Sequence, residues 1–287
     1  MKKIHQFILL TRLNRPTGYL LLFWPCLWGL SLAFYFNPNS VNYIYFILLF
    51  FLGSVLMRSA GCIVNDIVDR KIDIKVKRTK SRPIASGKVG ILEAWIYISI
   101  LCLLALIILL QFNNLTIILG MLSMTLAFSY PFMKRYTYWP QLFLGLTFNW
   151  GIVMAWTALN NELNAIPFVL YLSAIFWTLG YDTIYGAQDI ADDEIIGVKS
   201  TSVKFKENIK TFVSLCYFVS ISFLGVLIFI IDVKVYGYFI LILVAMQFLY
   251  QIIKFNKNNA DSCLKMFKSN NLIGLLIFIF FLSLQVN

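Results

Sequence analysis

Oxygen-bearing side chains recur at a helical interval where one long apolar stretch of the chain ends. The segment "NDIVDRKID" (65–73) follows about twenty almost wholly apolar residues. Asn65, Asp69 and Asp73 are spaced four residues apart, so on a helix they lie along one face, with Asp66 one step round it. Carboxylates at the edge of a bilayer are energetically costly and usually functional. The segment therefore predicts a cation site at the end of a helix.

A second acidic segment, "DIADDE" (189–194), follows another apolar stretch. Asp189 and Asp193 are again four residues apart, and Asp182 lies two helical turns earlier on about the same stripe. Two helix faces lined with oxygen ligands suit Mg²⁺, which takes carboxylates together with phosphate oxygens and waters. Ion pairs with nearby lysines and arginines are the alternative explanation. The gathering of most of the 13 acidic residues in or beside these two segments favours the metal site.

Basic residues suited to phosphate groups follow the first acidic segment. "KRTKSRP" (77–83) places Arg78 and Arg82 one helical turn apart, and guanidinium groups match phosphate oxygens. The stretch "YPFMKRYTYWPQ" (130–141) adds Tyr130, Lys134 and Arg135. Taken alone, each stretch is typical of a positively charged loop beside a membrane. Next to a Mg²⁺ cluster they indicate a clamp for a diphosphate.

The elements that must position these residues are membrane-spanning helices. Of the 287 residues 60% are hydrophobic and 13% charged, and the apolar blocks are long enough to cross about 30 Å of hydrocarbon as helices. They lack the alternation of a β-barrel strand. The sequence predicts an all-α integral membrane protein with one transmembrane domain over residues 1–287 and about nine helices in a single bundle. The predicted spans are 18–36, 41–64, 91–111, 114–130, 139–159, 165–187, 208–231, 235–254 and 271–286.

Membrane topology, rather than nucleic acid binding, explains the net charge of +11. With nine spans, all but Arg58 and Lys234 of the 24 lysines and arginines fall in the N-terminal tail or in loops on the same side. Positive charge is retained on the cytoplasmic side, so we expect these loops to face the cytoplasm or an organelle's matrix. "MKKIHQFILLTRLNR" predicts an amphipathic helix rather than a signal peptide, because Arg12 and Arg15 interrupt its apolar run. The early start of the motifs after Met1 leaves no room for a transit peptide, which favours a bacterial inner membrane.

The order of spans and loops suggests two related halves. Each acidic segment follows the second span of a four-span half and leads into a basic stretch, with the ninth span extra. The halves would bring the two acidic segments face to face. The five cysteines are scattered without metal-ligand spacing, and His5 is the only histidine, which argues against a His-ligated haem or zinc site. A diphosphate held at the membrane face most economically belongs to a lipid diphosphate, and the many aromatic residues suit an isoprenoid chain.

The segments "GCIVNDIVDRKIDIKVKRTKSRPIASGKV" and "YDTIYGAQDIADDEIIGVKSTSVKFK" resemble the two signature regions of the UbiA-type membrane prenyltransferases. "RLNRPTGYLLLFWPCLWGL" and "YPFMKRYTYWPQ" are similar to the branch of that family that prenylates 4-hydroxybenzoate for ubiquinone biosynthesis. The resemblance spans most of the chain. It implies nine helices around a central cavity and two Mg²⁺ ions that bridge protein and diphosphate. The expected partners are the two substrates and membrane lipid, and no nucleic acid.

Carried over residue by residue, the resemblance assigns roles to named positions. The implied metal ligands are Asn65, Asp69, Asp73, Asp189 and Asp193. The implied diphosphate contacts are Arg70, Arg78, Arg82, Lys134 and Lys199. Tyr130 and Lys134 match the family's Tyr-x-x-x-Lys pair, and Arg135 is our candidate for the carboxylate of the acceptor. Whether Asp66, Asp182 and Asp192 bind metal directly or support those that do is left open.

The expected reaction joins a polyprenyl diphosphate to 4-hydroxybenzoate. Cations stabilise the departing diphosphate, the allylic C–O bond loosens, and the ring carbon ortho to the hydroxyl attacks. A carboxylate such as Asp189 raises the electron density of the ring or accepts a proton. The product is 3-polyprenyl-4-hydroxybenzoate.

Three other functions remain open on sequence alone. The first keeps the chemistry but changes the acceptor, as in haem farnesyltransferases and quinone or chlorophyll-type prenyltransferases. The second is a transporter of lipid phosphates, although acidic residues gathered at one membrane face fit a surface-facing active site better than a site at the midplane. The third, a structural membrane subunit, gives the acidic segments no role.

Overall fold

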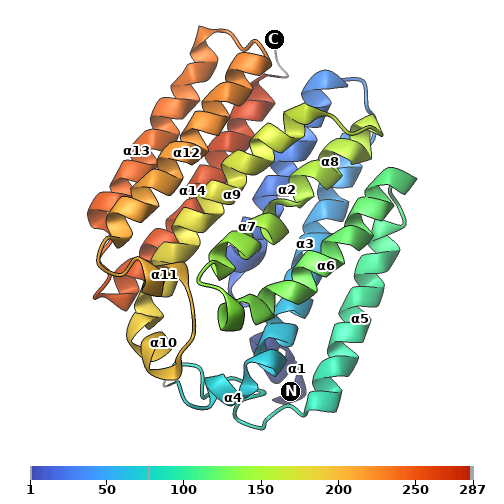
Figure 1. The fold of residues 1–287 in the computed structure, drawn as a ribbon. Helices are drawn as coiled ribbons and strands as arrows, with labels where there is room; N and C mark the ends of the chain where they lie inside the picture. The colour runs from blue at the N-terminus through green and yellow to red at the C-terminus, as the bar shows by residue number, and fades with distance from the viewer. Residues whose placement is uncertain (1, 77, 285–287) are drawn as a thin grey trace.

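The computed structural model of the protein describes residues 2–76 and 78–284, and within these ranges the chain is helical, without strands (Figure 1). The first half contains α1 (Lys2–Thr11), α2 (Pro16–Phe36), α3 (Tyr43–Val68), α4 (Arg70–Asp73), α5 (Ile91–Leu109), α6 (Asn114–Tyr136), α7 (Pro140–Asn149) and α8 (Gly151–Asn160). The second half contains α9 (Ala165–Gly186), η1 (Ala187–Asp189), α10 (Ile190–Ile196), α11 (Thr201–Lys204), α12 (Ile209–Ile230), η2 (Val235–Tyr238), α13 (Phe239–Lys254) and α14 (Ala260–Ser283). The predicted all-α membrane class is confirmed.

The predicted number of nine spans is approximate. In the described part of the chain eight segments are long and apolar enough to cross a membrane. The predicted span 235–254 consists of the 3₁₀ turn η2 followed by α13, whose 16 residues are too few for a straight crossing. The predicted fifth span, 139–159, is present as α7 and α8, which are joined at Trp150.

The predicted long loop at 255–270 is wrong, because most of it is helical. α14 begins at Ala260, well before the predicted start of the ninth span at residue 271. The side chain of Asn259 caps this helix by accepting a hydrogen bond from the backbone nitrogen of Ser262 at 3.1 Å. One face of the added turns is buried through Cys263, Met266 and Asn270, so packing inside the protein sustains a helix that hydropathy does not reveal.

The interior of the bundle is built around α2 and α9. α2 packs against α3, α8 and α14, while α9 packs against α7, α12 and α14. A Cβ atom on Gly29 of α2 would collide with the backbone of Ile152 in α8, so this glycine permits the two helices to approach closely. α5 lies at one edge of the bundle, against α3 and with little contact to α6 (Figure 1).

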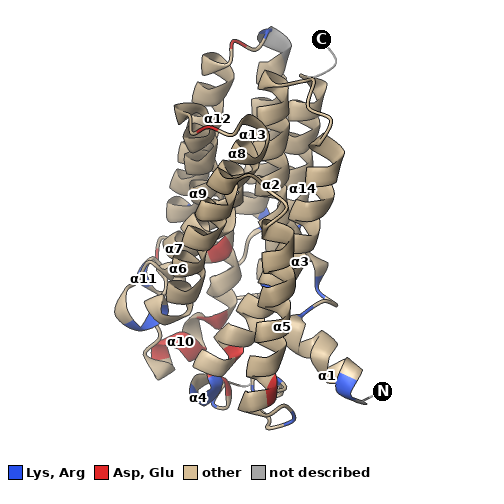
Figure 2. Cartoon of the chain, turned by 90° about the vertical axis from the view of Figure 1, so that its right-hand side faces the viewer, with Lys and Arg blue, Asp and Glu red and all other residues tan. Residues whose placement is uncertain are grey.

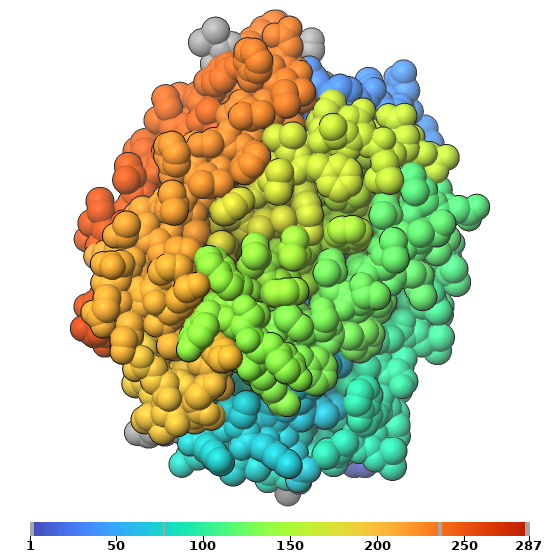
Figure 3. Space-filling view, in the orientation of Figure 1, coloured from blue at the N-terminus to red at the C-terminus, as the bar shows by residue number. Residues whose placement is uncertain are grey.

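Charged residues gather at one end of the bundle, where α1, α4, α10 and α11 also lie (Figure 2). The segment from α4 to the start of α5 covers this end between α10 and α5, as the space-filling view shows (Figure 3). α1 forms the predicted N-terminal helix at the same end. Most of the charged residues therefore lie at one end of the helices, as the sequence predicts (Figure 2).

Candidate active site

The two acidic segments line a single cavity of about 1360 Å³. Its walls come from α1 and the turn after it, from α2 to α6 with the loop between α4 and α5, and from α7 to α10, with a contribution from α14. All the predicted metal-ligating residues line this cavity: Asn65, Asp69, Asp73, Asp189 and Asp193. Asp66, Asp182 and Asp192 line it as well. The two halves of the chain thus bring the acidic segments together.

Helical spacing continues across the junction between α3 and α4, which keeps the first acidic segment on one face. The backbone nitrogen of Asp69 donates to the carbonyl of Asn65 at 2.8 Å. The backbone nitrogen of Asp73 donates in turn to the carbonyl of Asp69 at 2.8 Å. These two bonds are the i to i+4 bonds of an α-helix. The predicted alignment of the three side chains therefore survives although the regular helix ends at Val68.

Arg78 links the loop after the first acidic segment to the second segment. Its Nε and Nη2 atoms donate to the two carboxylate oxygens of Asp189 at 3.0 and 2.7 Å, and Nη1 donates to the hydroxyl of Tyr185 at 3.4 Å. Burial lowers the pKa of Arg78, but Tyr185 and Asp189 raise it by more, so the net shift is upward. The geometry is the two-pronged pairing that a guanidinium group also makes with phosphate.

The carboxylates of the first segment are paired with cations in the same way. Arg82 Nη1 donates to Asp73 Oδ2 at 2.8 Å and to Asp66 Oδ1 at 3.2 Å. Arg12 Nη2 donates to the same oxygen of Asp66 at 2.6 Å. Lys134 Nζ donates to Asp69 Oδ2. Predicted phosphate-binding cations and predicted metal-binding carboxylates are therefore in direct contact.

One oxygen of Asp69 lacks a partner. The residue is 2% exposed, and its Oδ1 atom is buried without a hydrogen bond to any described residue. Burial raises the pKa of the Asp69 carboxyl above its ordinary value, and the neighbouring Lys134 offsets this only in part. Buried polar atoms in proteins are nearly always paired. The free oxygen indicates that a further ligand belongs here.

The donor set fits a hard divalent cation. Candidate ligands are carboxylate and amide oxygens, which Mg²⁺ prefers. Within residues 2–76 and 78–284 no three His, Cys, Asp or Glu side chains converge closely enough to hold an ion by themselves. Asp69, Asp73 and Asp189 are each turned toward a lysine or arginine instead. Substrate oxygens and waters would have to complete any metal site.

The other predicted site residues divide into two groups. Arg78, Arg82, Tyr130, Lys134 and Lys199 line the cavity. Arg70 is exposed and does not line it. Arg135, our candidate for the acceptor's carboxylate, is also exposed and outside the lining, and its Nη2 donates to the carbonyl of Val68 at 2.8 Å.

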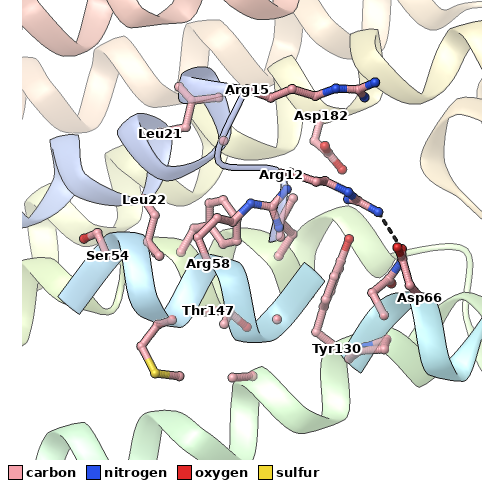
Figure 4. A pocket seen from close by; sticks show the side chains of 18 of the residues that line it. Arg12, Arg15, Leu21, Leu22, Ser54, Arg58, Asp66, Tyr130, Thr147 and Asp182 are labelled. Carbon is pink, nitrogen blue, oxygen red and sulfur yellow. Dashed lines mark hydrogen bonds and ion pairs between the residues drawn. The ribbon is translucent and has the colours of Figure 1, made fainter. Parts of the chain in front are cut away.

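Sequence reasoning missed a second group of charges deeper in the cavity. Arg12, Arg15 and Arg58 project into the same space as Tyr130 and Asp182 (Figure 4). Arg58 makes no ion pair with any described residue, and its guanidinium lies 5.3 Å from the ring centroid of Phe148. An arginine inside an apolar span is itself a signal of function. The position of Arg58 in the predicted second span carried that signal.

Another part of the cavity lining is mostly apolar. It extends between α3, α5, α6 and α8, away from the charged end. The side chains there include Phe50, Leu109, Phe112, Met121, Met124 and Met154. The cavity therefore combines a charged end with a long apolar arm.

Residues 22–283 match the model of the UbiA prenyltransferase family. The chain is 42% identical over 278 residues to a mitochondrial 4-hydroxybenzoate polyprenyltransferase of Arabidopsis thaliana, covering 96% of this chain and 68% of that one. It is 40% identical over 280 residues to a 4-hydroxybenzoate octaprenyltransferase of Blochmanniella pennsylvanica, covering 97% of this chain and 95% of that one.

Two solved structures share the fold. A UbiA homolog from Aeropyrum pernix K1 superposes with a TM-score of 0.77 at 20% sequence identity, over 92% of this chain and 97% of that one. A UbiA homolog from Archaeoglobus fulgidus bound to GPP and Mg²⁺ superposes with a TM-score of 0.72 at 17% identity, over 98% of this chain and 100% of that one.

Proposed function

Because the chain belongs to the UbiA prenyltransferase family, we propose that it transfers a polyprenyl group from polyprenyl diphosphate to 4-hydroxybenzoate. The new bond forms at the ring carbon ortho to the hydroxyl, and diphosphate leaves. The names of the curated relatives support this acceptor, which belongs to ubiquinone biosynthesis. The observation that carries the proposal is one cavity with clustered carboxylates and cations at its charged end and an apolar arm beyond.

The charged end is where the diphosphate belongs. Arg78, Arg82 and Lys134 each pair with a carboxylate in the structure, and Lys199 lines the same cavity. Cations that release a carboxylate can bind phosphate oxygens with the same geometry. They stabilise the negative charge that develops on the leaving diphosphate.

We assign the divalent metal to the same end. Asn65, Asp69 and Asp73 would hold one ion and Asp189 and Asp193 a second, with the unpaired Oδ1 atom of Asp69 available as a ligand. Bound Mg²⁺ would neutralise charge on the diphosphate and make it a better leaving group. The UbiA homolog from Archaeoglobus fulgidus, which shares this fold, is bound to GPP and Mg²⁺, and this supports the assignment.

The acceptor belongs in the deeper group of charges. Arg58 replaces Arg135 as our candidate for the carboxylate of 4-hydroxybenzoate, because Arg58 lines the cavity and lacks an ion-pair partner among the described residues. The acceptor's ring then lies between Arg58 and the charged end. Asp189, which lines the cavity, remains our candidate for activating the ring hydroxyl or accepting the ring proton.

The apolar arm suits the prenyl chain. Its aliphatic and aromatic lining removes an isoprenoid from water without demanding a fixed length. The helices around the reacting carbon exclude water, so a carbocation-like allylic centre meets the acceptor rather than a hydroxyl from solvent. Loss of the ring proton then restores aromaticity.

The protein is a multi-pass membrane protein, and we propose that its charged end faces the cytoplasm from the inner membrane. That end carries α4, α10 and α11 and most of the lysines and arginines (Figure 2). The positive-inside rule supports this orientation.

Prenyl transfer by membranes that contain the protein tests the proposal. Ring-labelled 4-hydroxybenzoate and a polyprenyl diphosphate are supplied with Mg²⁺ or with EDTA, for the wild-type chain and for Asp69→Asn. We expect label to enter the organic phase with Mg²⁺ and to fall at least about 100-fold with EDTA or in the variant. Asp261→Asn, an exposed carboxylate at the same end of the bundle and outside the cavity, is the matched control and should retain activity.

The other outcomes are distinct. Normal product formation by Asp69→Asn, or transfer that EDTA does not affect, would refute the metal assignment. If diphosphate were released with a different aromatic acceptor and not with 4-hydroxybenzoate, the proposed diphosphate site would stand and the proposed acceptor would be wrong.

A further inference from the structure

The guanidinium group of Arg58 enters the cavity from α3 without a carboxylate to fix its orientation (Figure 4). Arg12, Arg78 and Arg82 are each held by an aspartate. Arg58 makes no hydrogen bond or ion pair with a described residue, and Asp182 acts on it only at longer range. A long side chain without such contacts keeps many rotamers, and a ligand must then overcome their entropy. Other contacts must therefore define where this guanidinium lies.

The ring of Phe148 covers one side of the Arg58 guanidinium. Phe148 lies near the end of α7 and also lines the cavity. The Cζ atom of Arg58 lies over this ring, 5.3 Å from its centroid, which is within the range of a cation–π contact. Such a contact holds a guanidinium without pairing its N–H donors with an oxygen. The donors of Arg58 therefore remain available to a ligand.

Gly18, in the first turn of α2, leaves room for the same guanidinium. A Cβ atom at this position would lie 3.0 Å from Nε of Arg58 and 3.5 Å from its Nη2. The shorter distance is closer than ordinary van der Waals contact, so the guanidinium occupies space that a side chain on α2 would need. The obstacle is the end of a flexible side chain. An alanine at position 18 would therefore move the guanidinium and leave the two helices in place.

We propose that Phe148 and Gly18 are positioning residues for the acceptor, because they hold the guanidinium of Arg58 where it binds the carboxylate of 4-hydroxybenzoate. The inference rests on the proposed function, which assigns that carboxylate to Arg58. A guanidinium already held in one orientation loses less entropy when the ligand binds. A cation over an aromatic ring contributes roughly two- to thirtyfold to an equilibrium constant, and this sets the size of the expected effect.

Phe148→Leu removes the ring and keeps an apolar side chain. We expect the KM for 4-hydroxybenzoate to rise about fivefold, with kcat and the KM for the polyprenyl diphosphate within about twofold of wild type. Phe148→Tyr retains the ring and should keep the wild-type KM. Phe143→Leu, on the same helix but outside the cavity lining, is the matched control and should leave all three constants unchanged.

A double variant separates positioning from direct contact with the acceptor. In protein that already carries Arg58→Gln, Phe148→Leu should raise the acceptor KM no further, because the group that the ring holds is gone. If the two effects multiplied instead, Phe148 would act on the acceptor itself or support the fold, and its positioning role would be wrong. Phe148→Met is a second variant without a ring and should show the same pattern if Phe148→Leu accumulates poorly.

Gly18→Ala tests the other contact. We expect the KM for 4-hydroxybenzoate to rise several-fold in this variant, and to rise no further when Gly18→Ala is added to Arg58→Gln. The KM for the polyprenyl diphosphate should stay within about twofold of wild type. An unchanged acceptor KM in Gly18→Ala or in Phe148→Leu would overturn the positioning role of that residue.

Failure of the proposed function gives a different result. A wild-type protein that does not prenylate 4-hydroxybenzoate would refute the function itself. If the wild type prenylates 4-hydroxybenzoate but Arg58→Gln leaves the acceptor KM unchanged, the function would stand. The assignment of the carboxylate to Arg58 would then be wrong, and the positioning roles of Phe148 and Gly18 with it.

Discussion

At the scale of single residues, three cations at the charged end of the cavity are each paired with a carboxylate. Arg78 holds Asp189, Arg82 holds Asp73 and Lys134 holds Asp69. A charge buried without a partner is strongly destabilising, so these pairs make the cavity compatible with a folded protein. Substrate binding then exchanges one set of partners for another and creates no unpaired charge.

Arg58 has no such partner among the residues that the structure describes, and its removal should affect binding of the acceptor alone. We expect Arg58→Gln to raise the KM for 4-hydroxybenzoate at least tenfold, since about 1.4 kcal/mol of lost carboxylate binding suffices. The KM for the polyprenyl diphosphate should stay near wild type. Steady-state kinetics with each substrate varied in turn measures both constants.

Arg135→Gln is the comparison for this prediction. The guanidinium of Arg135 lies outside the cavity and bonds to the carbonyl of Val68, so its loss should leave the acceptor KM nearly unchanged. If the KM for 4-hydroxybenzoate rose more in Arg135→Gln than in Arg58→Gln, Arg135 would again be our candidate for binding the acceptor's carboxylate.

Sequence spacing was sufficient to predict that the acidic residues share one face, but it could not predict which arginines line the cavity. Asn65, Asp69 and Asp73 are aligned by the helix itself, so their four-residue interval predicts a common face. The direction of a long flexible side chain at a helix end has no such periodic signature. Arg135 follows Lys134 directly, yet Lys134 lines the cavity and Arg135 does not.

At the scale of the elements, hydropathy located the spans but not the packing that holds them. The helical turns before residue 271 in α14 and the 3₁₀ turn before α13 depend on neighbours within the bundle. A buried network shows such packing: Trp177 and Gln251 both donate to Asn270 Oδ1, at 2.8 and 3.2 Å. It joins α9, α13 and α14, and one indole and two amides in three separate apolar stretches give no sign in the sequence that they meet.

The contact between α2 and α8 gives a prediction at this scale. Gly29→Val places side-chain atoms against the backbone of Ile152, which cannot move as a flexible side chain would. We expect a loss of stability of about 2–4 kcal/mol, seen as a lower melting temperature of the purified protein in detergent. Gly225→Ala is the control, since its Cβ would make only an ordinary contact with Leu241, and its melting temperature should stay within the error of the wild type. Equal melting temperatures for the two variants would contradict a tight α2–α8 contact.

At the scale of the whole molecule, the gathering of charge at one end predicts the orientation in the membrane. Ser86 lies between α4 and α5, and Asn39 lies between α2 and α3; these two connections are at opposite ends of the bundle, and both residues are exposed (Figure 1). The test variants are Ser86→Cys and Asn39→Cys. A membrane-impermeant thiol reagent added to intact cells should label Asn39→Cys, and should label Ser86→Cys only after permeabilisation. The native cysteines are buried or half-buried, so the unmodified chain serves as the background control. The reverse pattern would invert the proposed topology.

The apolar arm gives a second prediction for the whole molecule. A side chain at Gly120 would meet Leu109 and Met154 and narrow the arm between α5, α6 and α8. We expect Gly120→Leu to lower kcat/KM several-fold more for an octaprenyl donor than for a geranyl donor, because only the long chain must pass this point. Competition between the two donors in one assay measures the ratio. An equal loss of kcat/KM with both donors would mean that the prenyl chain does not pass Gly120.

The arrangement of a charged end and an apolar arm in one cavity also bears on the direction of the reaction. The substrate joins a water-soluble anion to a lipid chain, and the transfer separates them. Diphosphate departs from the charged end into the aqueous compartment, where dilution and hydrolysis remove it. The prenylated ring keeps its chain in the bilayer and diffuses only in two dimensions. Partition of the two products into different phases opposes their recombination, and the two ends of the cavity match that partition because one end is charged and the other is apolar.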